Sequence, residues 1–194
     1  MSSVPELAID HIREFVLAGH GNLSRVQALL AATPALLNAA YKWRDNDFET
    51  ALQGAAHVGN RAIAEYLVAQ GAPVDICTAA MLGRQAAVKQ FVDADPEQIN
   101  ATGAHGIPLL PHAAFSGDVA FVAWLIEQGA RAGISAALHN AVSQEHVELT
   151  HWLLEHGDPD LGWKNFQGKT ALAIATEHGW EPIAEALRAH GATE

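Results

Sequence analysis

The stretch "ETALQGAAHVGNRAIAEYLVAQGA", Glu49–Ala72, decides the fold of this 194-residue chain. The small residues Ala55 and Ala56 stand just before Gly59, and Ile63 is the first of several apolar residues spaced along one helix face after it. The glycine ends the first helix, since it adopts a left-handed turn at low energy. Two helices this short cannot bury their own apolar faces, so the stretch must pack against neighbours.

The same frame recurs along the chain. Gly83, Gly117 and Gly179 have similar neighbours at the same offsets. Glu145 replaces the glycine once, and Gly21 marks the loosest copy. An ordinary helical bundle would not predict this fixed register, so the sequence indicates stacked repeats. We place six of them at residues 5–38, 47–75, 76–100, 106–133, 135–161 and 168–192, within a single domain over residues 1–194.

The repeats resemble those of the ankyrin family. The segments that carry the resemblance are "ETALQGAAHVG" (49–59), "GIPLLPHAAFSG" (106–117) and "GKTALAIATEHG" (168–179), with "GA" closing three copies. The family's Thr-Pro-Leu-His motif is never complete, because Ala51 and Ala171 stand where it has proline. The resemblance implies an all-α solenoid of stacked helix-turn-helix repeats, joined by hairpin-like loops called fingers.

The spacing of the repeats predicts which fingers are long. Equivalent positions recur every 62 residues from Gly21 to Gly83 to Glu145, so the unit is a pair of repeats present three times. We expect long fingers at 39–50, 101–109 and 162–171, named the first, second and third finger below. The first finger should be the longest. After repeats two and four the chain runs almost directly into the next helix, so two fingers should be truncated.

Composition narrows the classes of partner. The chain carries a formal net charge of −11, with 11 Lys and Arg against 22 Asp and Glu. Phosphate backbones are bound mainly through Lys and Arg, so we expect neither nucleic acid nor an anionic membrane as partner. No long apolar run and no secretory signal are visible. With Cys77 as its single cysteine, the chain is expected to be a cytoplasmic monomer.

Motifs for catalysis or cofactor binding are not found in the sequence. His146, His151 and His156 are five residues apart, which does not place them on one helix face. His151 and Glu155 could share a ligand, but a structural zinc site needs four donors. We therefore expect no enzyme activity, no cofactor and no metal site. Cys77 reads as a packed thiol rather than a nucleophile.

The resemblance also implies where a partner would bind. In ankyrin folds the two residues before each central glycine face a concave groove, and the fingers flank it. We predict the contact centre at Met81, Leu82 and Phe115, beside Trp43, Phe48 and His105, because exposed aromatics with polar neighbours make binding hot spots. The full predicted surface comprises Trp43, Arg44, Phe48, His57, Val58, Met81, Leu82, His105, Ile107, Phe115, Trp163 and Phe166.

These residues predict a non-catalytic protein-binding module, with three alternatives. The finger aromatics could instead be buried against each other. The chain could be a small-molecule or metal-dependent enzyme that uses the groove histidines His57, His105 and His178, which requires a closed pocket with convergent polar groups. It could also be a structural protein that self-associates through its end repeats.

Overall fold

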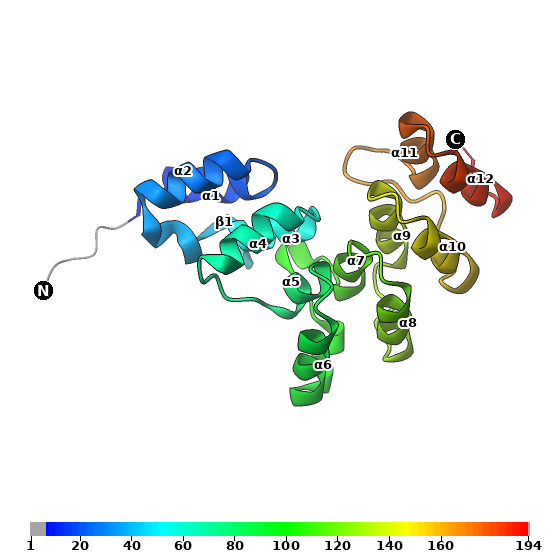
Figure 1. Ribbon diagram of the computed structural model, residues 1–194, viewed down its shortest axis with the longest axis horizontal. Coiled ribbons are helices and arrows are strands. Elements are labelled where there is room, and N and C mark those ends of the chain that lie inside the picture. Colours follow the sequence, from blue (N-terminus) through cyan, green and yellow to red (C-terminus); the bar gives the residue numbers. More distant parts are fainter. Residues whose placement is uncertain (1–6, 194) are drawn as a thin grey trace, which may run out of the picture.

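The computed structural model describes residues 7–193 and is built from paired antiparallel helices that follow one another along an arc (Figure 1). Residues 1–6 and 194 of the predicted domain lie outside the described part. The helices in the described part are α1 Ile9–Gly19, α2 Leu23–Ala32, α3 Ala51–His57, α4 Arg61–Ala69, α5 Ile76–Met81, α6 Gln85–Ala94, α7 Leu109–Ala114, α8 Val119–Glu127, α9 Ile134–Ser143, α10 Val147–His156, α11 Ala171–His178 and α12 Glu181–Ala189. The predicted all-α solenoid is confirmed, whereas the exact repeat boundaries stay predictions.

The turn within each helix pair has the expected conformation. Gly59, Gly117 and Gly179 adopt φ values of 73°, 72° and 71°. Glu145 adopts the same left-handed conformation with a φ of 57°, although it is not a glycine. Gly21, in the loosest copy, does not adopt this conformation, so the frame fixes the backbone here only in the later repeats.

Side-chain caps define where many of the helices begin. Thr50 accepts a hydrogen bond from the backbone N–H of Gln53, and the Gln53 side chain accepts one from the Thr50 N–H. The Asn60 and Asp118 side chains cap α4 and α8 by accepting from the backbone N–H groups of Ile63 and Phe121. Each cap satisfies a backbone donor that the first helical turn leaves without a partner.

The core has two parts. The N-terminal core cluster is built from α1 to α4 and extends to Met81 and Leu82 at the end of α5. The C-terminal core cluster runs from Ile76 through α12. Both are made of small residues between the first helices of adjacent pairs and larger apolar residues, such as Leu67 and Leu125, toward the second helices. The two clusters meet at α5.

The fingers differ in length, as expected. The first finger forms β1 Ala40–Arg44 and β2 Asp47–Thr50, an antiparallel pair with an irregularity between Lys42 and Arg44. The second finger has a short 3₁₀ turn, η3 Ala104–Gly106, and one bridge between Thr102 and Pro108. The third finger consists of turns. After repeats two and four the chain enters α5 and α9 with almost no finger.

Short 3₁₀ helices precede the first two long fingers. These are η1 Pro34–Asn38 and η2 Pro96–Asn100. They occupy equivalent places in repeats one and three, which agrees with a unit of two repeats. Within residues 7–193, none of the helices has both the length and the apolar character needed to cross a lipid bilayer.

Candidate functional site

Glu49 is a carboxylate in the interior of the first finger. It lies on β2 opposite Tyr41, and its side chain is 0% exposed. Burying an ionised carboxylate is expensive unless charges or donors surround it. The side chains that surround the Glu49 carboxylate must therefore supply charges or hydrogen-bond donors.

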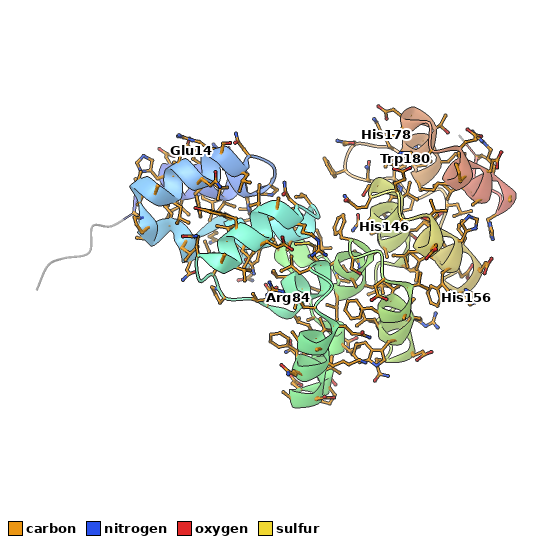
Figure 2. All side chains as sticks on the ribbon, in the orientation of Figure 1. Glu14, Arg84, His146, His156, His178 and Trp180 are labelled. Atoms are coloured by element: carbon orange, nitrogen blue, oxygen red, sulfur yellow. The ribbon has the colours of Figure 1, made fainter. Side chains whose placement is uncertain are left out.

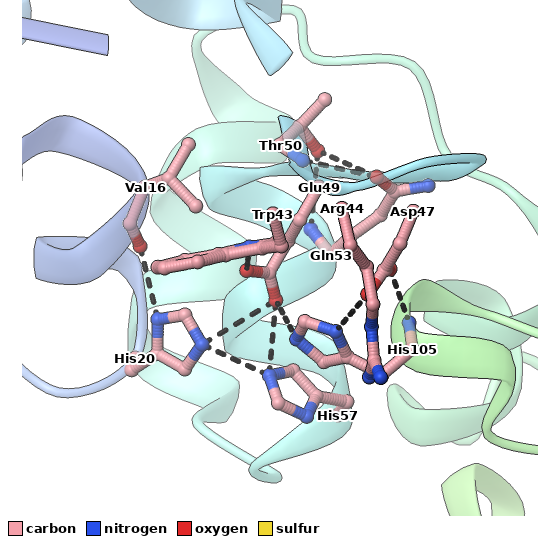
Figure 3. A network of polar contacts seen from close by, with 10 residues as sticks. All are labelled: Val16, His20, Trp43, Arg44, Asp47, Glu49, Thr50, Gln53, His57 and His105. Atoms are coloured by element: carbon pink, nitrogen blue, oxygen red, sulfur yellow. Dashed lines mark hydrogen bonds and ion pairs between the residues drawn. The ribbon is translucent and has the colours of Figure 1, made fainter. Parts of the chain in front are cut away.

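Three imidazoles surround one oxygen of this carboxylate (Figure 3). The distances from Glu49 Oε1 are 3.3 Å to His20 Nε2, 3.0 Å to His57 Nε2 and 3.5 Å to His105 Nε2. His57 Nε2 also lies 2.9 Å from His20 Nε2. We call these four residues the histidine–glutamate cluster.

The members of the cluster come from four separate elements. His20 follows the last residue of α1, His57 is the last residue of α3, Glu49 lies on β2 and His105 belongs to η3. His105 has a φ of 59°, and its backbone N–H donates to Asp47 Oδ1 at 3.1 Å. Stacking of repeats, rather than any local sequence motif, brings the cluster together.

A second layer of contacts orients the cluster. His20 Nδ1 lies 3.0 Å from the Val16 carbonyl oxygen, and His105 Nδ1 lies 3.0 Å from Asp47 Oδ2. The Trp43 indole N–H donates to the other Glu49 oxygen, Oε2, at 2.6 Å. Hydrogen bonds of this kind fix both the tautomer and the ring direction of a histidine.

Gly54 leaves the space that the His20 ring occupies. A Cβ at Gly54 would lie 3.0 Å from His20 Cε1 and 3.1 Å from Nδ1. That distance is shorter than ordinary van der Waals contact, so a larger residue would displace the imidazole. The absence of a side chain on this face of α3 thus contributes to the position of His20.

The charges within the cluster shift its pKa values. Burial raises the pKa of Glu49, but hydrogen bonds from His20 and His57 outweigh it and lower that pKa to about 2. The hydrogen bond with Glu49 raises the pKa of His20, against the opposing effect of burial. Hydrogen bonds with His105 and Arg44 lower the pKa of Asp47. Glu49 is therefore anionic at neutral pH.

Of the predicted surface residues, three finger aromatics are accessible. Phe48 is 54% exposed, Trp163 37% and Phe166 94%. The exposed Arg44 side chain pairs with Asp47 at 3.0 Å. For the three aromatics named here, the alternative that the fingers bury them against each other is wrong.

Other predicted residues lie at the site or are half-buried. Trp43, His57 and His105 belong to the histidine–glutamate cluster or its contacts. Val58 and Ile107 are half-buried, as is Phe115, whose ring packs against Gly59.

The prediction that Met81 and Leu82 are exposed at the contact centre is wrong. They are 1% and 6% exposed. Both belong to the N-terminal core cluster, against which Phe115 also packs, and they fill the junction between the two core clusters. A partner cannot reach them in this conformation.

The enzyme alternative grouped three histidines, of which the fold brings only two together. His57 and His105 meet in the cluster, but His178 stacks on Trp180 near the C-terminal end, with ring centroids 4.5 Å apart (Figure 2). A hollow of about 240 Å³ at the base of the first finger is lined by Leu37, Asn38, Thr50, Leu52, Gln53, Ala72, Pro73, Val74 and Asp75. None of the three histidines lines this hollow.

Sequence reasoning missed His20 and Glu49. His20 stands one residue before Gly21, in the groove position of the most irregular repeat, and Glu49 was read only as the end of a finger. The available signal was that both stand in the groove positions of adjacent repeats, His20 one residue before Gly21 and His57 two residues before Gly59. By contrast, His151 and Glu155 are exposed and lie outside the cluster.

Chemically, the cluster offers four donors to one point. One ligand atom from each of His20, Glu49, His57 and His105 lies within 4.8 Å of every other. Three imidazole nitrogens and a carboxylate oxygen are ligand types used by divalent transition metals. Cys77 is not comparable: burial raises its pKa to about 12, so the thiol stays neutral.

Comparison with known proteins gives matches along most of the array. A family model described as ankyrin repeats (3 copies) matches residues 110–193, and one described as ankyrin repeat matches residues 47–79. Over 56 residues the chain is 45% identical to the chicken (Gallus gallus) nuclear factor NF-kappa-B p105 subunit. That alignment covers 29% of this chain and 6% of the chicken protein.

Proposed function

Because the chain belongs to the ankyrin-repeat family, whose repeats generally mediate protein–protein interactions, we propose that it is a non-catalytic module that binds a protein partner through its concave groove and fingers. The observation that carries the proposal is the exposure of Phe48 and Phe166, at 54% and 94%. Large exposed aromatics on a stacked array can bind with little loss of conformational entropy.

The charge of the chain suggests what the partner presents. With a formal net charge of −11, the chain attracts a partner that has basic groups around an apolar segment. The apolar segment would contact the finger aromatics, and the basic groups would meet the acidic surface. We further propose that the chain acts as a monomer in the cytoplasm and binds neither nucleic acid nor membranes, which agrees with its acidity and its single buried thiol.

Photo-crosslinking tests the proposed surface. A photoreactive amino acid at position 166 should capture a partner from the native lysate, whereas the same group at Leu17, an exposed residue of α1, should not. The captured protein is then purified, and its affinity for the unmodified chain is measured by calorimetry.

Matched truncations then assign the contact. Phe166→Ala and Phe48→Ala should each weaken binding by about 10-fold or more, as truncation of a hot-spot aromatic does. Leu17→Ala should leave the affinity unchanged. Equal affinities for the wild type and both folded phenylalanine variants would show that the fingers are not the binding surface.

A further inference from the structure

We propose that His20, His57, His105 and Glu49 form a binding site for one divalent transition-metal ion, with zinc as the best match. The ligand atoms are the three histidine Nε2 atoms and Glu49 Oε1. This proposal replaces the sequence-based expectation of no metal site, and it does not depend on partner binding.

The hydrogen bonds of the outer nitrogens support a cation at the centre. A carbonyl oxygen can only accept, so His20 Nδ1, at 3.0 Å from the Val16 oxygen, carries the proton. By the same argument His105 Nδ1 carries a proton toward Asp47. In their neutral forms His20 and His105 therefore direct Nε2 lone pairs at Glu49, and only a second proton on either ring would let its Nε2 donate to the carboxylate.

Nitrogen lone pairs that face a carboxylate oxygen repel it unless a proton or a metal cation lies between them. Glu49 Oε1 is buried, and when the facing Nε2 atoms carry no proton it accepts no hydrogen bond within residues 7–193. A single cation would satisfy this oxygen and all three nitrogens together. The competing arrangement is a set of protonated histidines around Glu49, with no metal, and the experiments below distinguish the two.

The distances suit a tetrahedral ion. Zinc bonds of about 2.0–2.1 Å place tetrahedral ligand atoms about 3.3 Å apart. The three Nε2 atoms lie 3.0–3.5 Å from Glu49 Oε1, and His20 and His57 are 2.9 Å apart at Nε2. All four ligand atoms lie within 4.8 Å of one another, so modest ring rotations would close the set around one ion.

The surroundings are those of a built site rather than a chance meeting of surface side chains. Glu49 is fully buried, and the side chains of His57, His105 and His20 are 13%, 26% and 28% exposed. Trp43 holds the second Glu49 oxygen and Asp47 holds His105. The partly exposed histidines leave an approach for the ion from solvent.

Calorimetry on the intact protein tests the proposal. After treatment with a chelator and dialysis, wild type should bind one Zn²⁺ per chain in a saturable titration. His57→Gln should lose at least about 100-fold in affinity, beyond the roughly 10–100-fold that loss of an outer hydrogen bond brings. The control is His156→Gln, whose parent histidine, like His20, contacts a carbonyl four residues back but lies outside the cluster.

Two outcomes for wild type and His57→Gln would overturn the proposal. One is wild type without a saturable site for Zn²⁺, which is the result that protonated histidines alone would give. The other is equal affinity for wild type and folded His57→Gln, as judged by circular dichroism. Loss of binding in His156→Gln to the same degree as in His57→Gln would likewise contradict the assignment.

Cobalt substitution gives a readout that needs no variant. Co²⁺ bound by three nitrogens and one oxygen in tetrahedral geometry should show strong visible absorption that saturates at one ion per chain and disappears on addition of Zn²⁺. A weak spectrum like that of hydrated Co²⁺ would sink the proposal even if His57→Gln failed to fold.

Asp47 should act as a positioning residue. Asp47→Asn should lower the Zn²⁺ affinity by about 10–100-fold and keep the stoichiometry of one ion and the tetrahedral cobalt spectrum. An affinity equal to wild type would show that the Asp47–His105 contact has no role in the site.

Discussion

Gly59 and Gly179 occupy the same repeat position but differ in how closely other residues pack against them. Both have left-handed backbones, with φ values of 73° and 71°. A Cβ at Gly59 would lie 2.4 Å from a ring carbon of Phe115 in the next pair but one, whereas a Cβ at Gly179 would meet nothing within 4 Å. Gly59 thus serves both the turn and the packing between repeats.

Substitution with alanine should separate the two effects. Gly179→Ala should destabilise by about 1–2 kcal/mol, the cost of a left-handed backbone for a residue with a Cβ. Gly59→Ala should lower the free energy of unfolding further, because the Phe115 ring must also move. Urea unfolding of both variants measures the difference. Equal losses in stability would mean that Phe115 adjusts freely.

For single residues, the sequence predicted the backbone conformation better than it predicted which side chains are exposed. The glycine positions, including the exception at Glu145, follow from one repeating frame. The burial of Met81 and Leu82 could not be predicted from the sequence, because it depends on which neighbouring helix pairs cover them. His20 was missed since its repeat keeps few of the frame's residues, although its place beside the glycine is regular.

At the scale of elements, the second helices differ in how they begin. Asn22, Asn60 and Asp118 cap α2, α4 and α8 with side-chain oxygens. Arg84, in the equivalent place before α6, makes no such bond. Its positive charge also stands at the positive end of the helix dipole, which is unfavourable. Figure 2 labels Arg84 near this turn.

Arg84→Asp should therefore stabilise the protein. A capping side chain is worth about 0.5–2 kcal/mol, and the aspartate charge also suits the helix start. The gain should appear as a higher urea midpoint with an unchanged slope. Asp118→Ala, which removes an existing cap, is the matched opposite and should lower the midpoint. A lower midpoint for Arg84→Asp would contradict this account.

The helices and fingers were largely predictable from the sequence. The cluster of side chains that they bring together was not. Helix spacing and finger lengths follow from offsets between repeats, so the β1–β2 hairpin could be anticipated as the longest finger. The histidine–glutamate cluster draws on β2, η3 and the ends of α1 and α3. Residues from places that far apart carry no shared local pattern, and only three-dimensional stacking brings their side chains to one point.

At the scale of the whole molecule, the division of the core has consequences for stability. The N-terminal and C-terminal core clusters meet at α5, where Met81 and Leu82 belong to the first cluster and Ile76 to the second. In a linear array each pair stabilises mainly its neighbours. We therefore expect the two clusters to unfold separately.

Hydrogen exchange should detect separate unfolding of the two core clusters. Leu67 and Leu153 are both 0% exposed, one in each cluster, and replacing either with alanine should destabilise its surroundings by about 2–5 kcal/mol. Leu67→Ala should speed exchange in α1–α4 and leave α8–α12 protected, and Leu153→Ala should do the converse. Faster exchange across the entire chain in both variants would show a single cooperative unit.

The first finger carries polar side chains that the repeat frame of the helices does not require. From Gly21 to Gly59 is 38 residues, four more than from Gly83 to Gly117. Ten residues before the glycine the chain has Glu49 in the first finger, Ile107 in the second and Lys169 in the third. The helices that hold the array together are much the same on either side. The first and second fingers thus contribute Glu49 and His105 to the histidine–glutamate cluster while the helix frame stays the same, so the fingers are the natural place to graft new sites onto this chain.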